Sequence, residues 1–146
     1  MKLKMLLLTL FCAGLSFAAV AAPVAAPVPG SPADVATKFF RAIVKGDQAT
    51  AEKYAVGAKV KVEIKNGIAQ MKAMKAQAMK DPKNAVLWKA FENITFVEGK
   101  VTGDRAEVYM FVSLEIDGKK QENVDKSNPL FLRKVGGQWK VDTDRM

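Results

Sequence analysis

The chain has 146 residues, and its 23 lysine and arginine residues outnumber its 15 acidic residues, which gives a formal charge of +8. It contains one cysteine and no histidine, so Ser-His-Asp catalysis, Cys-His catalysis and histidine-based metal sites are excluded. The sequence indicates no catalytic residue, no metal site and no cofactor.

The first 21 residues have the anatomy of a cleavable signal peptide. Lys2 and Lys4 precede an apolar run over residues 5–15, which is too short to span a bilayer comfortably. Cleavage after Ala21 fits the small-x-small rule best, and cleavage after Ala18 is the alternative. We therefore expect an exported protein, either periplasmic or secreted, with no membrane span.

The single cysteine, Cys12, lies within the signal peptide. Phe11 precedes it, where a lipid-modified cysteine would follow a small residue, so a lipoprotein is disfavoured. The mature chain then has no thiol and depends on its core for stability. Residues 22–30 form a linker rich in proline and alanine, and residues 31–146 are expected to form a single domain.

The chain pattern predicts two consecutive helices after the linker. Ser31, Pro32 and Asp34 are suited to the start of a helix, and Gly46 is suited to its end. Asp47 is expected to cap a second, short helix that runs through Tyr54.

The next segment is predicted as a short strand followed by a helix. Apolar side chains alternate over residues 60–64, which favours a strand, and residues 68–80 consist largely of strong helix formers. Asp81-Pro82 is expected to end that helix.

From Asn93 onward the hydrophobic period changes to two, which is typical of strands. The clearest strand covers residues 106–116, with Asp117-Gly118 as a hairpin turn after it. The expected strands are 94–101, 106–116, 129–135 and 138–142. These elements predict an α+β domain with helices first and an antiparallel meander of about four strands afterwards.

Three stretches resemble the nuclear-transport-factor-2-like, or cystatin-like, superfamily. They are SPADVATKFFRAIVKGDQATAEKYA at residues 31–55, VEGKVTGDRAEVYMFV at 97–112 and LFLRKVGGQWKVD at 130–142. The sequence is most similar to small bacterial exported domains of unknown function, including lumazine-binding-like ones. The resemblance implies N-terminal helices packed on a curved antiparallel sheet, which form a cone-shaped roll with an apolar pocket. It leaves open whether a member binds, assists or catalyses.

We expect a non-catalytic exported domain that binds a small apolar ligand in the cone pocket, or a protein partner through its sheet face. The periodic patterns place seven large side chains inward, where they either line the pocket or pack the core that a small domain needs for stability: Phe39, Phe40, Ile43, Met71, Met110, Val112 and Trp139. Tyr109 and Phe111 fall on the opposite strand face, where exposed aromatic side chains would form the face of a homodimer.

Two alternatives remain. An isomerase- or dehydratase-like enzyme would need a carboxylate base and a tyrosine or acid donor, drawn from Tyr54, Tyr109, Asp34 and Asp47. A binder of anionic envelope components would use the basic segment Lys59–Lys89, whose eight lysines oppose only two acidic residues. Nucleic acid is not expected as a partner, because that segment has no arginine and one aromatic group that stacks on bases, Trp88.

Overall fold

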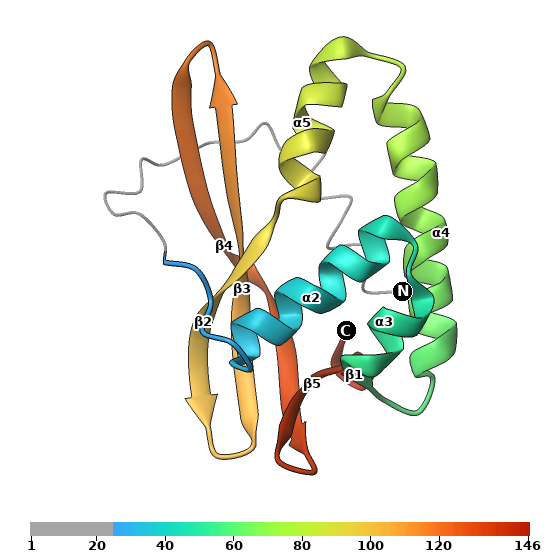
Figure 1. The fold of residues 1–146 in the computed structure, drawn as a ribbon, viewed down its shortest axis with the longest axis vertical. Helices are drawn as coiled ribbons and strands as arrows, with labels where there is room; N and C mark the ends of the chain where they lie inside the picture. Colours follow the sequence, from blue (N-terminus) through green and yellow to red (C-terminus); the bar gives the residue numbers. More distant parts are fainter. Residues whose placement is uncertain (1–24) are drawn as a thin grey trace.

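The computed structural model describes residues 25–146, except for the side chain of residue 116. Residues 25–146 form four α-helices and a five-stranded sheet, and every strand except the first, two-residue one follows the helices in the chain (Figure 1). The helices are α2 (Pro32–Lys45), α3 (Gln48–Lys53), α4 (Val60–Ala78) and α5 (Pro82–Glu92). The strands are β1 (Ala55–Val56), β2 (Thr95–Thr102), β3 (Arg105–Ile116), β4 (Lys119–Val135) and β5 (Gln138–Asp142). The predicted α+β class is confirmed.

The sheet has the strand order β1-β5-β4-β3-β2. Strands β2 to β5 form the predicted antiparallel meander, and the two-residue β1 adds a parallel pairing to β5. Strand β1 follows α3 directly, so its pairing with β5 connects the helical segment to the last strand in the chain. A single turn of 3-10 helix, Thr143–Arg145, follows β5.

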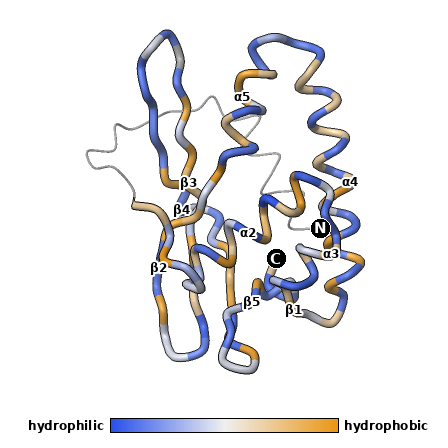
Figure 2. Tube along the Cα trace, in the orientation of Figure 1, coloured by the Kyte–Doolittle hydropathy of each residue, from blue (hydrophilic) through white to orange (hydrophobic). Residues whose placement is uncertain are grey.

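A core of aromatic and aliphatic side chains lies between the helices and the sheet. Phe40 from α2 contacts Phe91 from α5 and Phe96 from β2 in edge-on geometry, with ring centroids 5.3 Å and 5.8 Å apart. Trp88 packs on Phe91 at 5.3 Å and is 2% exposed. Figure 2 shows that hydrophilic residues recur along α4 and around its turn into α5. None of the helices within residues 25–146 is long and apolar enough to cross a membrane.

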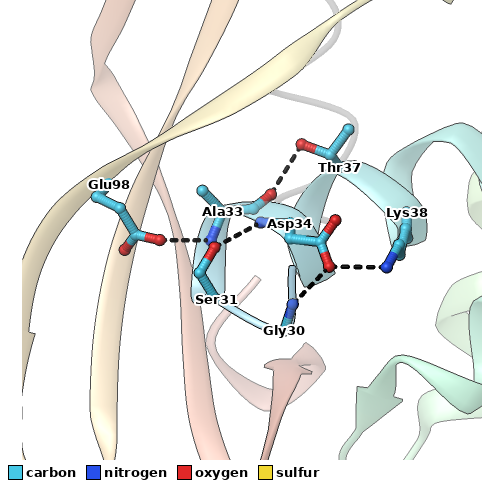
Figure 3. Close-up of polar contacts among 7 residues, drawn as sticks. All are labelled: Gly30, Ser31, Ala33, Asp34, Thr37, Lys38 and Glu98. Carbon is cyan, nitrogen blue, oxygen red and sulfur yellow. Dashed lines mark hydrogen bonds and ion pairs between the residues drawn. The ribbon is translucent and has the colours of Figure 1, made fainter. Parts of the chain in front are cut away.

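The start of α2 is held by side chains from two parts of the chain (Figure 3). Ser31 Oγ accepts a hydrogen bond from the Asp34 N–H at 3.2 Å, and Glu98 Oε1 on β2 accepts one from the Ala33 N–H at 3.0 Å. Both carboxylate and hydroxyl oxygens satisfy N–H groups that a helix leaves unpaired at its first turn. The predicted cap at Ser31 is confirmed, and Gly46 ends the helix at a φ of 77° as expected.

Thr37 connects the buried side of α2 to the edge strand β2. Its hydroxyl donates to the Ala33 carbonyl at 2.8 Å and accepts from the Phe96 N–H at 3.0 Å. Because Thr37 is buried, this contact gives the Phe96 N–H a partner that water does not supply.

The strand predicted over residues 60–64 is wrong, because these residues form the first turns of α4. Ile64 is 1% exposed whereas Val62 is 56% exposed, so the alternation does not correspond to one buried face of a strand. Ile64, Ile68 and Met71 instead recur at helical spacing toward the core. Packing of α4 against α2 and α3 outweighs the strand preference of the β-branched residues. The helix predicted at 68–80 therefore begins earlier and ends at Ala78.

Helix α5 was not predicted, although its start repeats the signal that identified α2. Asp81 Oδ1 accepts from the Lys83 N–H at 2.8 Å, and Pro82 occupies the first helical position. From the sequence, Asp81-Pro82 was expected only to end the preceding helix. The same dipeptide ends α4 and begins α5.

Strand β3 confirms the predicted alternation. Val108, Met110 and Val112 are buried, whereas Tyr109 and Phe111 are half-buried on the opposite face. Strand β4 is much longer than predicted and begins at Lys119. Its first ten residues are polar except for Val124, so they show no apolar alternation in the sequence. The pairing with β3 shifts register between Val108 and Met110, which separates this half from the predicted one.

Candidate functional site

A cleft of about 490 Å³ lies in the described part of the chain, where α2, α4 and α5 meet. Helix α2 runs past the α4–α5 pair, so its last turns face both helices (Figure 1). The lining residues are Arg41, Val44, Lys45, Lys75, Glu92 and Asn93.

Helix α2 supplies the cleft with two cations from its solvent side. Phe40 and Ile43 turn into the core, which leaves Arg41 and Lys45 exposed. Their spacing of four residues places them on one side of the helix, one turn apart. Among residues 25–146, neither forms an ion pair, so both charges remain available to a ligand.

Helices α4 and α5 supply a fixed pair of opposite charges. Lys75 Nζ donates to Glu92 Oε1 at 3.0 Å, and the buried Trp88 indole donates to the same oxygen at 2.7 Å. Burial alone would raise the pKa of Glu92, but hydrogen bonds from Lys75 and Trp88, with the nearby positive charges of Lys75 and Lys89, hold it below its usual value. Glu92 is therefore ionised at neutral pH and orients Lys75 in the cleft.

The cleft carries an excess of positive charge. Arg41, Lys45 and Lys75 oppose the single carboxylate of Glu92, for a net charge of +2. A guanidinium presents a planar fork of donors that matches carboxylate and phosphate oxygens. The arrangement can therefore bind an anion.

Further lysines surround the cleft and belong to the basic segment Lys59–Lys89. Lys72 lies beside the corner between α2 and α3, since its Cε would be 3.6 Å from a Cβ placed at Gly46. Lys89 lies on α5, and its charge helps to hold the pKa of Glu92 below the usual value. The predicted basic segment thus contributes to the field around the cleft, although Lys75 is the residue of that segment that lines it.

The seven residues predicted for an apolar pocket lie together in the core. Six are buried, and Trp139 is half-buried against the same cluster: Phe39, Phe40, Ile43, Met71, Met110, Val112 and Trp139. They pack between α2, α4 and the sheet, and the basic cleft is lined by other residues. The apolar ligand pocket stays a prediction.

Tyr109 and Phe111 lie on the outer face of the sheet, as expected, but each is half-buried within one chain. The Tyr109 ring packs over Gly99, where an added Cβ would lie 2.7 Å from the ring. This contact explains part of the burial of Tyr109 without a second molecule. The homodimer stays a prediction.

The four residues considered for an enzyme do not form one cluster. Asp34 accepts from the Gly30 N–H and pairs with Lys38 at 2.7 Å, whereas Asp47 caps α3 through the Thr50 N–H. The Tyr54 ring lies below Lys38 and Lys53, at 6.0 Å and 5.7 Å from their Nζ atoms. Tyr109 is on the far side of the sheet. Within residues 25–146, no cluster of acidic side chains is suited to a metal ion.

Four residues of the cleft were not predicted from the sequence as site residues: Arg41, Lys45, Glu92 and Asn93. A signal for the first two was available, because the exposed side of the first predicted helix carries Arg41 and Lys45 four residues apart. No comparable signal existed for Glu92, since α5 had not been predicted. The convergence of three helices on one cleft required the tertiary structure.

Comparisons with known proteins give one family and one similar structure. The family model described as domain of unknown function DUF4878 matches residues 25–142. A crystal structure from Campylobacter jejuni, provisionally named an NTF2-like transpeptidase, is 22% identical with a TM-score of 0.44. The match covers 77% of this chain and 97% of that one. The comparison with curated proteins found no match.

Proposed function

We propose that this chain, which belongs to the DUF4878 family of domains of unknown function, is an exported, non-catalytic binding module for anionic components of the bacterial envelope. The observation that carries the proposal is the basic cleft, where Arg41 and Lys45 on α2 face Lys75 on α4. The cleft is the binding site, and the surrounding lysines strengthen the positive field around it.

Charge supports an anionic ligand over the other ligand classes considered. A cleft lined by cations attracts anions and raises their local concentration, and the lysines of α4 and α5 extend the same field over the helical surface. Nucleic acid is not proposed, because Trp88 is buried in the core and so offers no surface on which a base could stack.

Export is part of the proposal, and it places the module where such ligands occur. The signal peptide pattern of residues 1–21 lies outside the described residues, and it predicts a mature chain that begins at Ala22. The intact mass of the protein from the exported fraction of its host would test this directly. A mass that includes residues 1–21 would contradict export by cleavage.

A protein partner on the outer sheet face is a second candidate, because Tyr109 and Phe111 keep part of their aromatic surface exposed there. A homodimer through this face would be seen as twice the chain mass in light scattering. The apolar ligand has weaker support, since its predicted residues fill the core. An isomerase- or dehydratase-like activity has the least support, because its candidate residues are dispersed.

The decisive experiment measures binding of the mature protein to vesicles. Vesicles of phosphatidylglycerol present anions, and vesicles of phosphatidylcholine serve as the neutral reference. Each basic residue near an anionic surface contributes about 1 kcal/mol, so the double variant Arg41→Gln/Lys45→Gln should bind about thirtyfold more weakly. Binding should also weaken as salt rises.

The matched control removes the same charge from another part of the helical surface. Lys61→Gln/Lys65→Gln changes two exposed residues of α4 that do not line the cleft. We expect this variant to lose less than about threefold in affinity, because its charges act only at long range. Equal losses in the two double variants would contradict the cleft as the site, and equal binding to both vesicle types would contradict the proposed function.

A further inference from the structure

We infer that the cleft between α2, α4 and α5 recognises a compact dianion, the phosphate monoester group of a hydroxyl-bearing molecule. This inference rests on the anion-binding role proposed above and specifies its ligand. It is carried by the charge balance of the cleft, the hydrogen-bonding groups that remain free, and the size of the space.

The charge balance matches two negative charges. Arg41, Lys45 and Lys75 bring three positive charges into a space that contains one carboxylate. A monoanionic diester or sulfate ester would leave one positive charge of the lining uncompensated, whereas a phosphate monoester near neutral pH carries ≈ −1.5 to −2 and neutralises the cleft. The planar fork of Arg41 can bind two oxygens of one phosphate, and the lysines add point charges.

The free hydrogen-bonding groups favour a ligand that also carries a hydroxyl. Glu92 accepts both of its hydrogen bonds through Oε1, so Oε2 has no partner among residues 25–146. Asn93 donates one amide hydrogen to the Lys89 carbonyl at 2.9 Å, which leaves the second hydrogen for a ligand oxygen. A hydroxyl next to the phosphate would donate to Glu92, and a phosphate oxygen would accept from Asn93.

The size of the cleft fits a small molecule. Its volume of about 490 Å³ is within the range of small-ligand sites, which is ≈ 300–1,000 Å³. The space accommodates a phosphate with an attached polyol, and the single apolar lining residue, Val44, gives little surface for a large hydrophobic group.

The absence of histidine makes pH a clean probe of the ligand. Histidine is the side chain whose charge ordinarily changes between about pH 5 and pH 8, and this chain has none. The charged groups that face the cleft or lie beside it come from all three helices: Arg41 and Lys45, Lys72 and Lys75, Glu92 and Lys89. A phosphate monoester takes up a proton with a pKa of about 6, so its affinity should fall about tenfold from pH 7.5 to about pH 5.

The test uses tryptophan fluorescence and calorimetry on the mature protein. The chain has two tryptophans, so Trp139→Phe leaves Trp88, whose indole is bonded to the cleft residue Glu92. Titration with glycerol 3-phosphate should give saturable binding, a change in Trp88 emission and the pH dependence above. Glycerol sulfate, a monoanion throughout this range, should bind at least about tenfold more weakly because one ionic contact is lost.

Matched variants locate the site. Arg41→Gln should weaken glycerol 3-phosphate binding at least about tenfold, because a hydrogen bond to a charged group is lost. Arg105→Gln makes the same change at an exposed residue at the start of β3, and its binding should stay within about twofold of the parent. Circular dichroism of both variants checks that the fold is retained.

The outcomes separate this inference from the proposed function. Glycerol sulfate that binds as tightly as the phosphate ester, or affinity that does not change with pH, would overturn the dianion, even if phosphatidylglycerol vesicles still require Arg41. Loss of binding to every anion tested would overturn the proposed function as well. Vesicles that contain lysophosphatidic acid present the same monoester next to a free hydroxyl on a lipid, so pH-dependent binding to them alone assigns the ligand to a lipid headgroup, and binding of glycerol 3-phosphate assigns a soluble one.

Discussion

The two sides of α2 meet different surroundings. Its inner side joins Phe40 to the aromatic core and Thr37 to the backbone of β2, so these side chains have all their partners within the chain. Its outer side presents Arg41 and Lys45 to a cleft in which neither has an ion-pair partner among the described residues. The inner side therefore stabilises the fold, whereas the cations on the outer side form no ion pair among residues 25–146 that would stabilise it.

The largest loss of stability is expected when a core side chain on the inner side of α2 is removed. Phe40→Ala removes the ring between Phe91 and Phe96 and should lower the free energy of unfolding by about 3–5 kcal/mol. Urea unfolding followed by circular dichroism measures this loss. Val44→Ala, on the cleft side of the same helix, should cost less than about 1 kcal/mol. Similar losses for the two variants would contradict the distinction between the two sides.

A smaller effect should follow when the link from α2 to β2 is removed. Thr37→Val keeps the shape of the side chain but leaves the Phe96 N–H buried without its acceptor, which should cost about 1–3 kcal/mol. Thr102→Val, at the exposed end of β2, provides the control and should stay within about 0.5 kcal/mol of the parent. Amide hydrogen exchange at Phe96 should quicken in Thr37→Val, and an unchanged exchange rate would show that the link does not protect this strand.

Acid should act on the cleft through Glu92. Its pKa is lower in the folded chain than in the unfolded chain, so the unfolded chain binds the proton more readily. The stability contributed by this carboxylate is therefore present above its unfolded pKa of about 4.3, and it is lost as pH falls through the lower folded value. Glu92→Gln should flatten this part of the pH profile of stability. A variant profile parallel to that of the parent would show that Glu92 does not contribute.

The smallest effect on stability is expected at the outer side of α2. Arg41→Gln/Lys45→Gln removes two exposed cations without ion-pair partners in the described chain, so the free energy of unfolding should stay within about 0.5 kcal/mol of the parent. Thermal unfolding measures this, and the same protein is used for the binding experiments. A loss of several kcal/mol would assign a structural role to these cations and remove them as free binding groups.

The elements predicted correctly are those whose ends carry local signals. Ser31 and Asp47 each cap a helix, Gly46 ends one, and Asp117-Gly118 turns β3 into β4. The alternation of β3 was visible because one face of that strand is buried along most of its length. In these segments, the local preference and the tertiary environment favour the same conformation.

The wrong predictions lie in segments where the local sequence preference and the tertiary environment favour different conformations. Residues 60–64 have a strand pattern that packing against α2 and α3 overrides. The first half of β4 is a strand although its polar residues show no apolar alternation. Asp81-Pro82 can both end one helix and begin the next, and only the fold showed that α5 follows it.

By itself, the sequence determined the α+β class, the first two helices, the four antiparallel strands that follow residue 93, the cap at Ser31 and the positive charge of the segment Lys59–Lys89. The cleft was decided by the tertiary structure alone. Its cations come from α2 and α4 and its carboxylate from α5, and these are brought together by the burial of Phe40, Phe91 and Trp88 beneath them. A site assembled from the exposed sides of three helices has no period or spacing along the chain, because each residue is placed by the packing on the opposite side of its helix.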